Sequence, residues 1–208
     1  SPYCLPPGNI QISFSGGRTS AFMLHQILEA NGGLPDRCKV TFSNTGRELP
    51  ETLDFVQECG QRWNVDIIWV EYRRGEGKNT YDIVSHNSAS RNGEPFEALV
   101  SSKPYLPNVV TRFCTTELKI RPMKKYLVSC GWKNWSAAVG IRADEVHRAK
   151  KESKDRWQYW YPLVEAGVSK MDVYDFWSAQ PFDLRLENIN GKSPLGNCDM
   201  CFLKSEAT

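Results

Sequence analysis

The sequence contains no apolar run long enough to cross a bilayer, and it opens without a recognisable secretion signal. It also has little excess charge of either sign, because 26 basic and 24 acidic side chains leave a formal net charge of +2. Such a small charge argues against bulk binding to nucleic acid, although local basic clusters remain. We therefore expect a protein of the cytoplasm with no membrane partner.

Cysteine is present, but not in the pattern of a disulfide framework. The seven cysteines are an odd number, and most of them are scattered along a chain of 208 residues. In a reducing compartment, a close cysteine pair more often indicates metal or redox chemistry than a structural bridge. The length and the 40% hydrophobic content fit one well-cored domain over residues 1–208.

The most informative segment connects a strand pattern at residues 10–14 to a helix pattern at residues 21–28. Its two adjacent glycines let the backbone turn sharply and bring its N–H groups close to a ligand. The first amides of a helix lack intrahelical partners, so they attract anions. The Gly-Lys-Ser/Thr of the Walker pattern is missing, and a phosphate site and a plain helix cap both remain open. The candidate phosphate-binding residues are Ser15, Gly16, Gly17, Arg18, Thr19 and Ser20.

Strand and helix patterns alternate along the chain. Strand patterns cover residues 10–14, 39–43, 65–70 and 135–139, and helix patterns cover residues 50–63 and 123–128. This alternation predicts an α/β fold with a parallel sheet and helices on both faces. Ligands in such folds bind at the carboxyl ends of the strands. We therefore expect one binding rim, formed by residues 15–20, 44–48 and 140–145.

The span 73–108 has few periodic apolar residues and several Gly, Ser, Asn and Pro residues. A stretch of this length inside a compact domain is usually functional or mobile. We interpret it as short helices that form a lid-like insertion, with a surface excursion as the alternative. The aromatic run at 157–163 is typical of core or edge-strand packing.

The second rim segment, residues 44–48, follows a strand. Gly46 permits a tight turn, Asn44 and Thr45 would hydrogen-bond a base, and Glu48 would anchor a ribose hydroxyl or a cation. The alternative is a simple turn with a carboxylate near a helix N-terminus.

The third rim segment begins at Gly140, again directly after a strand. Arg142 would clamp a phosphate in bidentate fashion, and Asp144 and Glu145 would hold that arginine or bind Mg²⁺. A surface charge cluster is the alternative.

A basic segment places the thiol of Cys114 near Arg112, Lys119 and Arg121. Cations near a thiol favour reactivity, and such a cluster attracts phosphate or sulfate. The alternative is a solvated basic helix start with a buried cysteine.

A Cys-x-x-Cys motif at Cys198 and Cys201 lies in the C-terminal segment, about residues 190–208. Two such thiolates reach one metal but do not complete a four-ligand site, and Cys114 is the best third ligand. Three cysteines and no evident fourth ligand suit a [4Fe–4S] cluster with one open iron. Structural zinc and a redox disulfide are the alternatives.

Six segments occur in register over about residues 10–204: SFSGGRTS, FSNTGRELPETLDFV, ASRNGEPF, PNVVTRFCTTELKIRP, GIRADE and GNCDMCFLK. Together they resemble the phosphoadenosine phosphosulfate reductase-like family of the adenine nucleotide α-hydrolase superfamily, whose ATP pyrophosphatases carry the PP-loop. The resemblance implies a Rossmann-like three-layer sandwich with a mostly parallel sheet. It also implies an adenine nucleotide as ligand, with phosphates on residues 15–20 and the nucleotide beside residues 44–48. Gly140, Arg142, Asp144 and Glu145 would complete the rim, and Cys114, Cys198 and Cys201 match cluster-binding positions.

The chain departs from this family in ways that bear on the reaction. Arg18 replaces the usual PP-loop lysine, and Phe113 precedes Cys114 where cluster-bearing reductases have a second cysteine. The catalytic C-terminal cysteine motif of those reductases is also missing. The three-cysteine set is more similar to PP-loop enzymes that thiolate tRNA, and the SGG-x-x-S loop favours ATP over a phosphosulfate.

The leading hypothesis is an ATP- and Mg²⁺-dependent, iron–sulfur-assisted sulfurtransferase that adenylates its acceptor. The acceptor would be a nucleic acid or a small molecule, a protein would donate the sulfur, and a homodimer is one alternative for the assembly. A sulfonucleotide reductase and a non-catalytic nucleotide-binding protein with structural zinc are the competing hypotheses. The candidate catalytic residues are Arg18, Cys114, Lys119 and Arg142.

Overall fold

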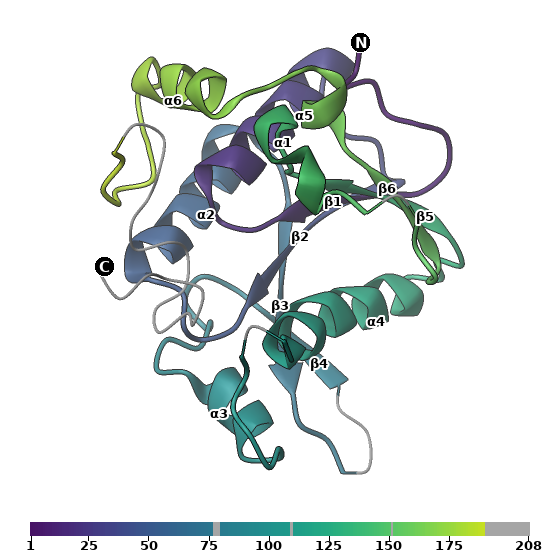
Figure 1. Cartoon of the computed structure of the whole chain (residues 1–208), viewed down its shortest axis with the longest axis vertical. Helices are drawn as coiled ribbons and strands as arrows, with labels where there is room; N and C mark the ends of the chain where they lie inside the picture. Colours follow the sequence, from purple (N-terminus) through teal and green to yellow (C-terminus); the bar gives the residue numbers. More distant parts are fainter. Residues whose placement is uncertain (77–79, 109, 151, 190–208) are drawn as a thin grey trace.

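The computed structural model describes residues 1–76, 80–108, 110–150 and 152–189. Its centre is a six-stranded sheet with the strand order β4-β3-β2-β1-β5-β6 (Figure 1). Every neighbouring pair is parallel except β3 and β4, which are antiparallel. The strands are β1 (Ile10–Phe14), β2 (Cys38–Asn44), β3 (Ile67–Arg73), β4 (Thr80–Val84), β5 (Trp135–Val139) and β6 (Trp157–Trp160). The mostly parallel sheet confirms the predicted α/β class.

Helices cover both faces of the sheet, which makes three layers (Figure 1). Helices α1, α2 and α6 pack on one face, and α4 packs on the other. The helical segments are α1 (Arg18–Asn31), α2 (Pro50–Arg62), α3 (Glu94–Val100), the π-helical η1 (Thr115–Ile120), α4 (Arg121–Ser129), the 3₁₀-helical η2 (Ala143–Arg148), α5 (Pro162–Glu165) and α6 (Lys170–Ser178). Within the described ranges, no helix combines the length and the apolar character that a membrane span needs.

The core follows from the two-residue period of the strands. Ile10, Ile12 and Phe14 of β1 are fully buried in the cluster that includes α1 and α2. Gln11 points to the opposite face and is also buried, so its amide needs partners there. It donates to Thr41 Oγ1 at 2.9 Å and accepts from Trp135 Nε1 at 3.2 Å. This satisfied polar contact ties the three central strands together.

Several elements differ from the sequence-based expectation. Helix α1 begins at Arg18, so the last three residues of the expected turn form the first helical turn. The strand pattern at 65–70 becomes β3 at 67–73. The insertion at 73–108 contains the expected short helix, α3, but also the strand β4. Strand β4 was not recognisable in the sequence, because it is an edge strand without an apolar run. Its Ile83 is exposed.

Candidate functional site

The sheet topology gathers the three predicted rim segments. Strands β2, β1 and β5 are adjacent and parallel, with Ile12 paired to both Val40 and Ala138. Their carboxyl ends therefore lie at the same side of the sheet, and each is followed by one of the segments 15–20, 44–48 and 140–145. The expected gathering of the three segments is confirmed, while ligand binding at this rim stays a prediction.

Gly16 makes the sharp turn between β1 and α1. Its φ is +77°, a left-handed conformation that side chains disfavour. A Cβ at this position would lie 2.6 Å from Thr52 Cγ2 and 3.2 Å from Phe42 Cε2. The turn therefore needs glycine for two independent reasons, backbone strain and lack of space.

The two serines of the loop hold its shape. The Ser15 N–H donates to Ser20 Oγ at 3.1 Å, and the two hydroxyl oxygens are 3.0 Å apart. The Ser20 hydroxyl also donates to the Gly17 carbonyl at 2.9 Å. These bonds close a small ring, which orders the loop before any ligand binds.

The N-terminus of α1 has the features of an anion site. Gly17 is the N-cap in extended conformation, with no side-chain cap, and the first turn contains no acidic residue. The Ala21 N–H donates to the Gly17 carbonyl at 3.1 Å and begins the helical ladder. The amides before it point out of the helix end, where the helix dipole adds partial positive charge. This end suits a phosphate.

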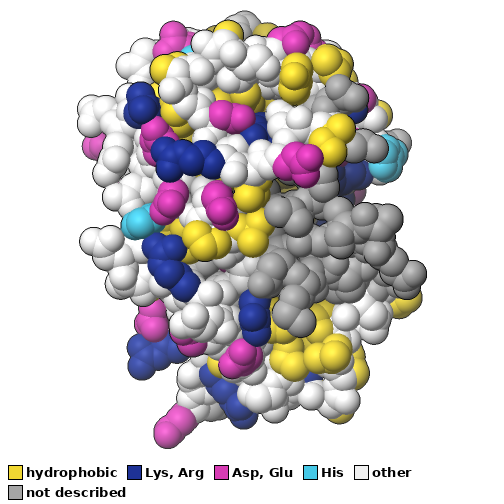
Figure 2. Space-filling model, turned by 90° about the vertical axis from the view of Figure 1, so that its left-hand side faces the viewer, with side chains coloured by type: hydrophobic (Ala, Val, Ile, Leu, Met, Phe, Trp, Pro, Cys, Tyr) yellow, Lys and Arg dark blue, Asp and Glu magenta, His cyan; other side chains and the backbone are white. Residues whose placement is uncertain are grey.

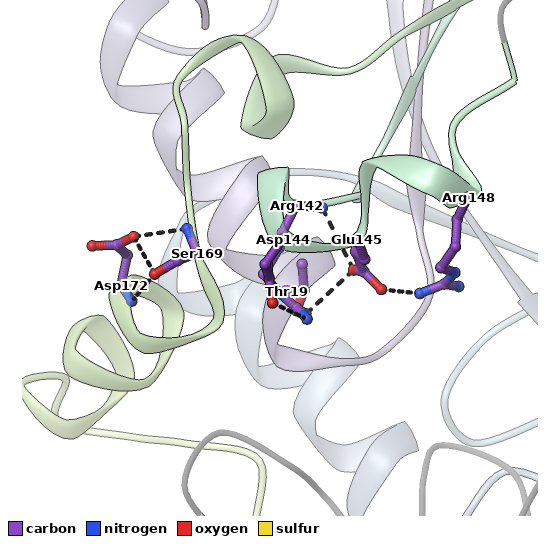
Figure 3. A network of polar contacts seen from close by, with 7 residues as sticks. All are labelled: Thr19, Arg142, Asp144, Glu145, Arg148, Ser169 and Asp172. Atoms are coloured by element: carbon purple, nitrogen blue, oxygen red, sulfur yellow. Dashed lines mark hydrogen bonds and ion pairs between the residues drawn. The ribbon is translucent and has the colours of Figure 1, made fainter.

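Arg142 lies directly against this helix end (Figure 3). Its Nη1 donates to Thr19 Oγ1 at 3.1 Å, and its Nε donates to Asp144 Oδ1 at 2.9 Å. Glu145 Oε1 lies 3.3 Å from Nη1 and turns its other oxygen to Arg148. The two carboxylates therefore hold the arginine, which was one of their two predicted roles.

Close packing brings the third segment to the loop. A Cβ on Gly140 would lie 3.2 Å from Ser20 Cα and 3.4 Å from Ser20 N. The hydrogen bond from Arg142 holds the pKa of Asp144 below its ordinary value, so this carboxylate is charged at neutral pH. The rim thus carries a fixed cation beside the open helix end.

The polar side chains of the second rim segment, residues 44–48, are engaged in hydrogen bonds within the protein. Glu48, which is buried, accepts from the Thr45 N–H at 2.7 Å and from the Thr45 hydroxyl at 2.8 Å. Asn44 is fully buried and donates to Glu71 and to the Ser90 carbonyl, while the Ser90 N–H donates to Glu71 Oε1 at 2.7 Å. The side chains proposed to contact a base or ribose therefore shape the turn, while Gly46, at φ +76°, allows it.

Arg18 has different contacts from those that its place in the loop suggested. Its guanidinium is 9% exposed and donates to both carboxylate oxygens of Asp183 at 2.7 Å. The same group donates to the carbonyls of Leu184 and Leu186. Helical geometry turns this side chain to the segment after α6, so these contacts do not support the expected phosphate role.

Cys114 precedes the π-helical segment η1, and π-helical turns are frequent at functional sites. This segment lies beside the rim, because Ser43 Oγ donates to the Lys119 carbonyl at 3.1 Å and Lys119 Nζ is 3.5 Å from Glu48 Oε1. Cys114 is a free, partly exposed thiol. The sequence pattern showed the basic cluster but not the π-helical winding.

The structure describes only one of the three predicted metal ligands, Cys114. Cys198 and Cys201 lie outside the described residues, and the ranges that the structure describes hold no group of three potential metal ligands. Cys114 is partly exposed, and its pairing with the other two cysteines stays a prediction.

Sequence reasoning missed several residues that shape the site. Thr52 packs over Gly16, Glu71 and Ser90 fix Asn44, and Asp183 binds Arg18. Thr52 and Ser90 belonged to segments with a recognisable pattern, whereas Glu71 and Asp183 did not. On the face in Figure 2, basic and acidic side chains lie side by side, as the small net charge suggested.

Known proteins of uncharacterized function have sequences similar to this chain. The chain is 33% identical over 202 residues to the uncharacterized nin region protein ORF290 of Escherichia phage lambda, which covers 93% of this chain and 66% of that protein. It is 27% identical over 118 residues to the uncharacterized protein MJ0973 of Methanocaldococcus jannaschii, covering 57% of this chain and 22% of that protein. The chain thus spans less than two thirds of these relatives.

Solved structures share the fold. A phosphoadenylyl-sulfate reductase from Candida auris, in a phosphate complex, has a TM-score of 0.51 and 14% identity, covering 86% of this chain and 76% of that one. An NH3-dependent NAD synthetase from Campylobacter jejuni has a TM-score of 0.50 and 13% identity, covering 82% and 62%. Residues 9–175 match the sequence profile of the phosphoadenosine phosphosulfate reductase domain. The chain therefore belongs to the phosphoadenosine phosphosulfate reductase domain family, with the α/β fold of the PP-loop adenine nucleotide α-hydrolases.

Proposed function

We propose that this chain is an ATP-dependent, iron–sulfur-assisted sulfurtransferase that adenylates its acceptor. One observation carries the proposal: the uncapped first turn of α1, shaped by Gly16, lies against the fixed guanidinium of Arg142. A helix N-terminus without a side-chain cap, next to a cation, suits a polyphosphate. Membership in the phosphoadenosine phosphosulfate reductase domain family supports a nucleotide as the ligand, and the SGG-x-x-S form of the loop is the reason for choosing ATP.

In the proposed reaction, the loop of residues 15–20 holds the phosphates of ATP. An oxygen of the acceptor attacks the α-phosphorus and forms a new P–O bond. The bond between the α-phosphorus and its bridging oxygen breaks, and pyrophosphate leaves. Arg142 and the amides of α1 stabilise the negative charge that builds up in the transition state.

Mg²⁺ would bind together with the phosphates, because it commonly takes one or two carboxylates plus phosphate oxygens. Asp144 is the most open carboxylate of the rim, with a side chain 41% exposed against 13% for Glu145 and 1% for Glu48. Asp144 is therefore our candidate ligand for Mg²⁺, and its carboxylate would contact both the metal ion and Arg142.

Cys114 supports the sulfur-transfer half of the proposal, since its segment contacts the rim through Ser43, Lys119 and Glu48. A [4Fe–4S] cluster held by Cys114, Cys198 and Cys201 would supply an open iron for sulfur. Of these three ligands, only Cys114 lies among the residues that the structure describes. The acceptor would be a nucleic acid or a small molecule, and the donor a protein.

A second candidate is a sulfonucleotide reductase. It is favoured by the family profile, and the solved phosphoadenylyl-sulfate reductase shares the fold. In this case a thiolate would attack the sulfur of the sulfonucleotide, the bond from sulfur to the phosphate oxygen would break, and the adenosine phosphate would leave. The added reductant would then cleave the sulfur–sulfur bond and release sulfite. Cys114 is a partly exposed cysteine beside the rim.

The two candidates are separated by the nucleotide that the pure protein consumes. The protein, purified without oxygen, is incubated with ATP and candidate acceptors, or with each sulfonucleotide and a reductant. Pyrophosphate from ATP supports the sulfurtransferase, and sulfite from a sulfonucleotide supports the reductase. Release of neither, together with one zinc and no iron or sulfide, would contradict both and favour a non-catalytic nucleotide-binding protein.

The role of Arg142 is tested by nucleotide binding. Arg142→Ala should weaken binding of α,β-methylene-ATP by at least about tenfold, because it removes a charge-assisted contact at the open helix end. Arg148→Ala is the matched control, since Arg148 contacts Glu145 but has a side chain that is 60% exposed. Equal affinities of the two variants would remove Arg142 from the site.

A further inference from the structure

Arg18 joins two distant parts of the chain. It is the first residue of α1, and its side chain binds Asp183 in bidentate fashion, 165 residues further along. The guanidinium also donates to the carbonyls of Leu184 and Leu186. On the main-chain side, the Arg18 carbonyl accepts from Trp177 Nε1 of α6 at 3.0 Å. One residue of the phosphate loop is thus bound by α6 and by the segment after it.

The segment 182–186 is held firmly at this place. Leu184 and Leu186 are buried in the same hydrophobic cluster as α1 and α2. The Phe182 ring packs against Phe55, Trp63 and Trp177, with centroid distances of 6.0, 5.9 and 5.5 Å. The partners of Arg18 therefore rest on a fixed support and do not move freely with the arginine.

The contacts require arginine and not lysine. A guanidinium offers a planar set of donors that binds a carboxylate bidentately and reaches carbonyls at the same time, whereas an ammonium is a single point charge. The Asp183 side chain is 37% exposed, but the Arg18 guanidinium is buried, so removing Asp183 would leave a buried positive charge with carbonyl partners alone among the contacts described here. These contacts therefore suit an arginine at position 18 better than the lysine that the family resemblance implies there.

We propose that Arg18 and Asp183 are a positioning pair for the phosphate loop. The pair acts through the backbone: it holds the first turn of α1 against the segment 182–186, so that the amides of the loop are already oriented when a nucleotide arrives. Preorganised donors bind charge better because no further ordering is needed. The inference rests on the proposed nucleotide site and gives Arg18 a role there without phosphate contact.

The pair also couples the two regions. If the contact between residues 18 and 183 strengthens nucleotide binding, then nucleotide binding must strengthen the contact by the same factor. Nucleotide should therefore slow hydrogen exchange of the amides at 182–186, even though these residues are placed outside the proposed site.

Asp183→Asn separates positioning from direct phosphate binding. Under the proposal, this variant binds α,β-methylene-ATP about tenfold more weakly, as does Arg18→Lys, and the double variant is no weaker than either single one. If Arg18 binds phosphate directly, Asp183→Asn releases the guanidinium and leaves binding unchanged or stronger. Either of those results would overturn the proposal.

A control variant and a hydrogen-exchange measurement distinguish the positioning role of the pair from general effects on folding and from a failure of the proposed nucleotide binding. Arg185→Gln is the matched control in the same segment, since Arg185 is 70% exposed and contacts Glu58, and it should bind like the wild type. Hydrogen exchange of residues 16–20 without nucleotide should be faster in Asp183→Asn. If the wild type binds no nucleotide, the proposed function fails while this exchange difference still tests the pair. Unchanged exchange in Asp183→Asn would contradict the positioning role.

Discussion

Two helices begin close together in this protein, and they begin in opposite ways. Helix α6 is closed by its own side chains: Ser169 accepts from the Asp172 N–H, and Asp172 accepts from the Ser169 N–H at 2.7 Å (Figure 3). Helix α1 starts at Gly17 with no side-chain cap and no acidic residue in its first turn. The Ala143 N–H donates to the Val168 carbonyl at 2.8 Å, which joins the rim to the loop before α6.

The comparison sets a helix that its own side chains cap beside one that they do not, and α1 shares the lack of a side-chain cap with α2, α3, α4 and α5. Helix ends leave amides that need partners, and a short motif such as that of α6 supplies them. The first turn of α1 is instead shaped by Gly16 and flanked by Arg142, which supports our proposal that an external anion binds there. Four changes test this difference, and they are given from the largest expected effect to the smallest.

Gly16→Ala should have the largest effect. A side chain at φ +77° is strained, and its Cβ would lie 2.6 Å from Thr52 Cγ2. We expect a loss of about 1–3 kcal/mol in the free energy of unfolding and no measurable binding of α,β-methylene-ATP, by denaturation and calorimetry. Gly32→Ala, at φ +64° with no atom within 4 Å of the new Cβ, is the control and should retain binding. Normal binding by Gly16→Ala would rule out the loop as the phosphate site.

Gly17→Asp would close α1 in the way that α6 is closed. Its extended backbone accepts any residue, and an aspartate there caps the helix while placing a negative charge at the phosphate position. Nucleotide affinity should fall about tenfold or more, while the thermal midpoint is kept or raised slightly. Gly17→Asn, a cap without charge, should show a smaller loss. Equal losses for both would mean that charge at this helix end is unimportant.

Ser169→Ala would open α6. Losing an N-cap serine costs about 1 kcal/mol of stability, which urea denaturation measures, and nucleotide affinity should not change. Ser178→Ala, at the other end of the same helix, should change stability by less than about 0.5 kcal/mol. A marked loss of nucleotide affinity in Ser169→Ala would show that the two helix ends are not independent.

Asp172→Asn should have the smallest effect, visible only in acid. The hydrogen bond from the Ser169 side chain lowers the pKa of Asp172. A group with a lowered folded-state pKa stabilises the fold above its unfolded pKa, and this contribution is lost as pH falls through the folded-state value. Wild-type stability should therefore decline slightly more steeply than that of Asp172→Asn between about pH 4 and pH 2. Parallel declines would mean that the cap is neutral.

Much of the scaffold could be predicted because local patterns are enough for it. The expected strands at 10–14 and 135–139 match β1 and β5 residue for residue. Strand β4 and the π-helical turn after Cys114 were not expected, since an exposed edge strand has no apolar run and π-helical winding has no simple sequence pattern.

The roles of single polar residues were harder to predict than the rim itself. Asn44 and Glu48 were expected to face a ligand, and they turn inward to Glu71 and Thr45. Arg18 was expected at the phosphates and binds Asp183. A polar residue type indicates which bonds a side chain can make, but only the fold decides which partner is near.

The amino-acid sequence by itself determined the alternation of strands and helices, the glycine turn at Gly16 and the three polar segments that follow strands. These features could be predicted because the hydrophobic period and the backbone freedom of glycine depend only on residues close in the sequence. Only the tertiary structure decided that Arg142 lies against the first turn of α1, and that Arg18 binds Asp183. Those contacts join residues up to 165 positions apart. A buried polar group needs a hydrogen-bond partner, and the fold decides which partner lies near it.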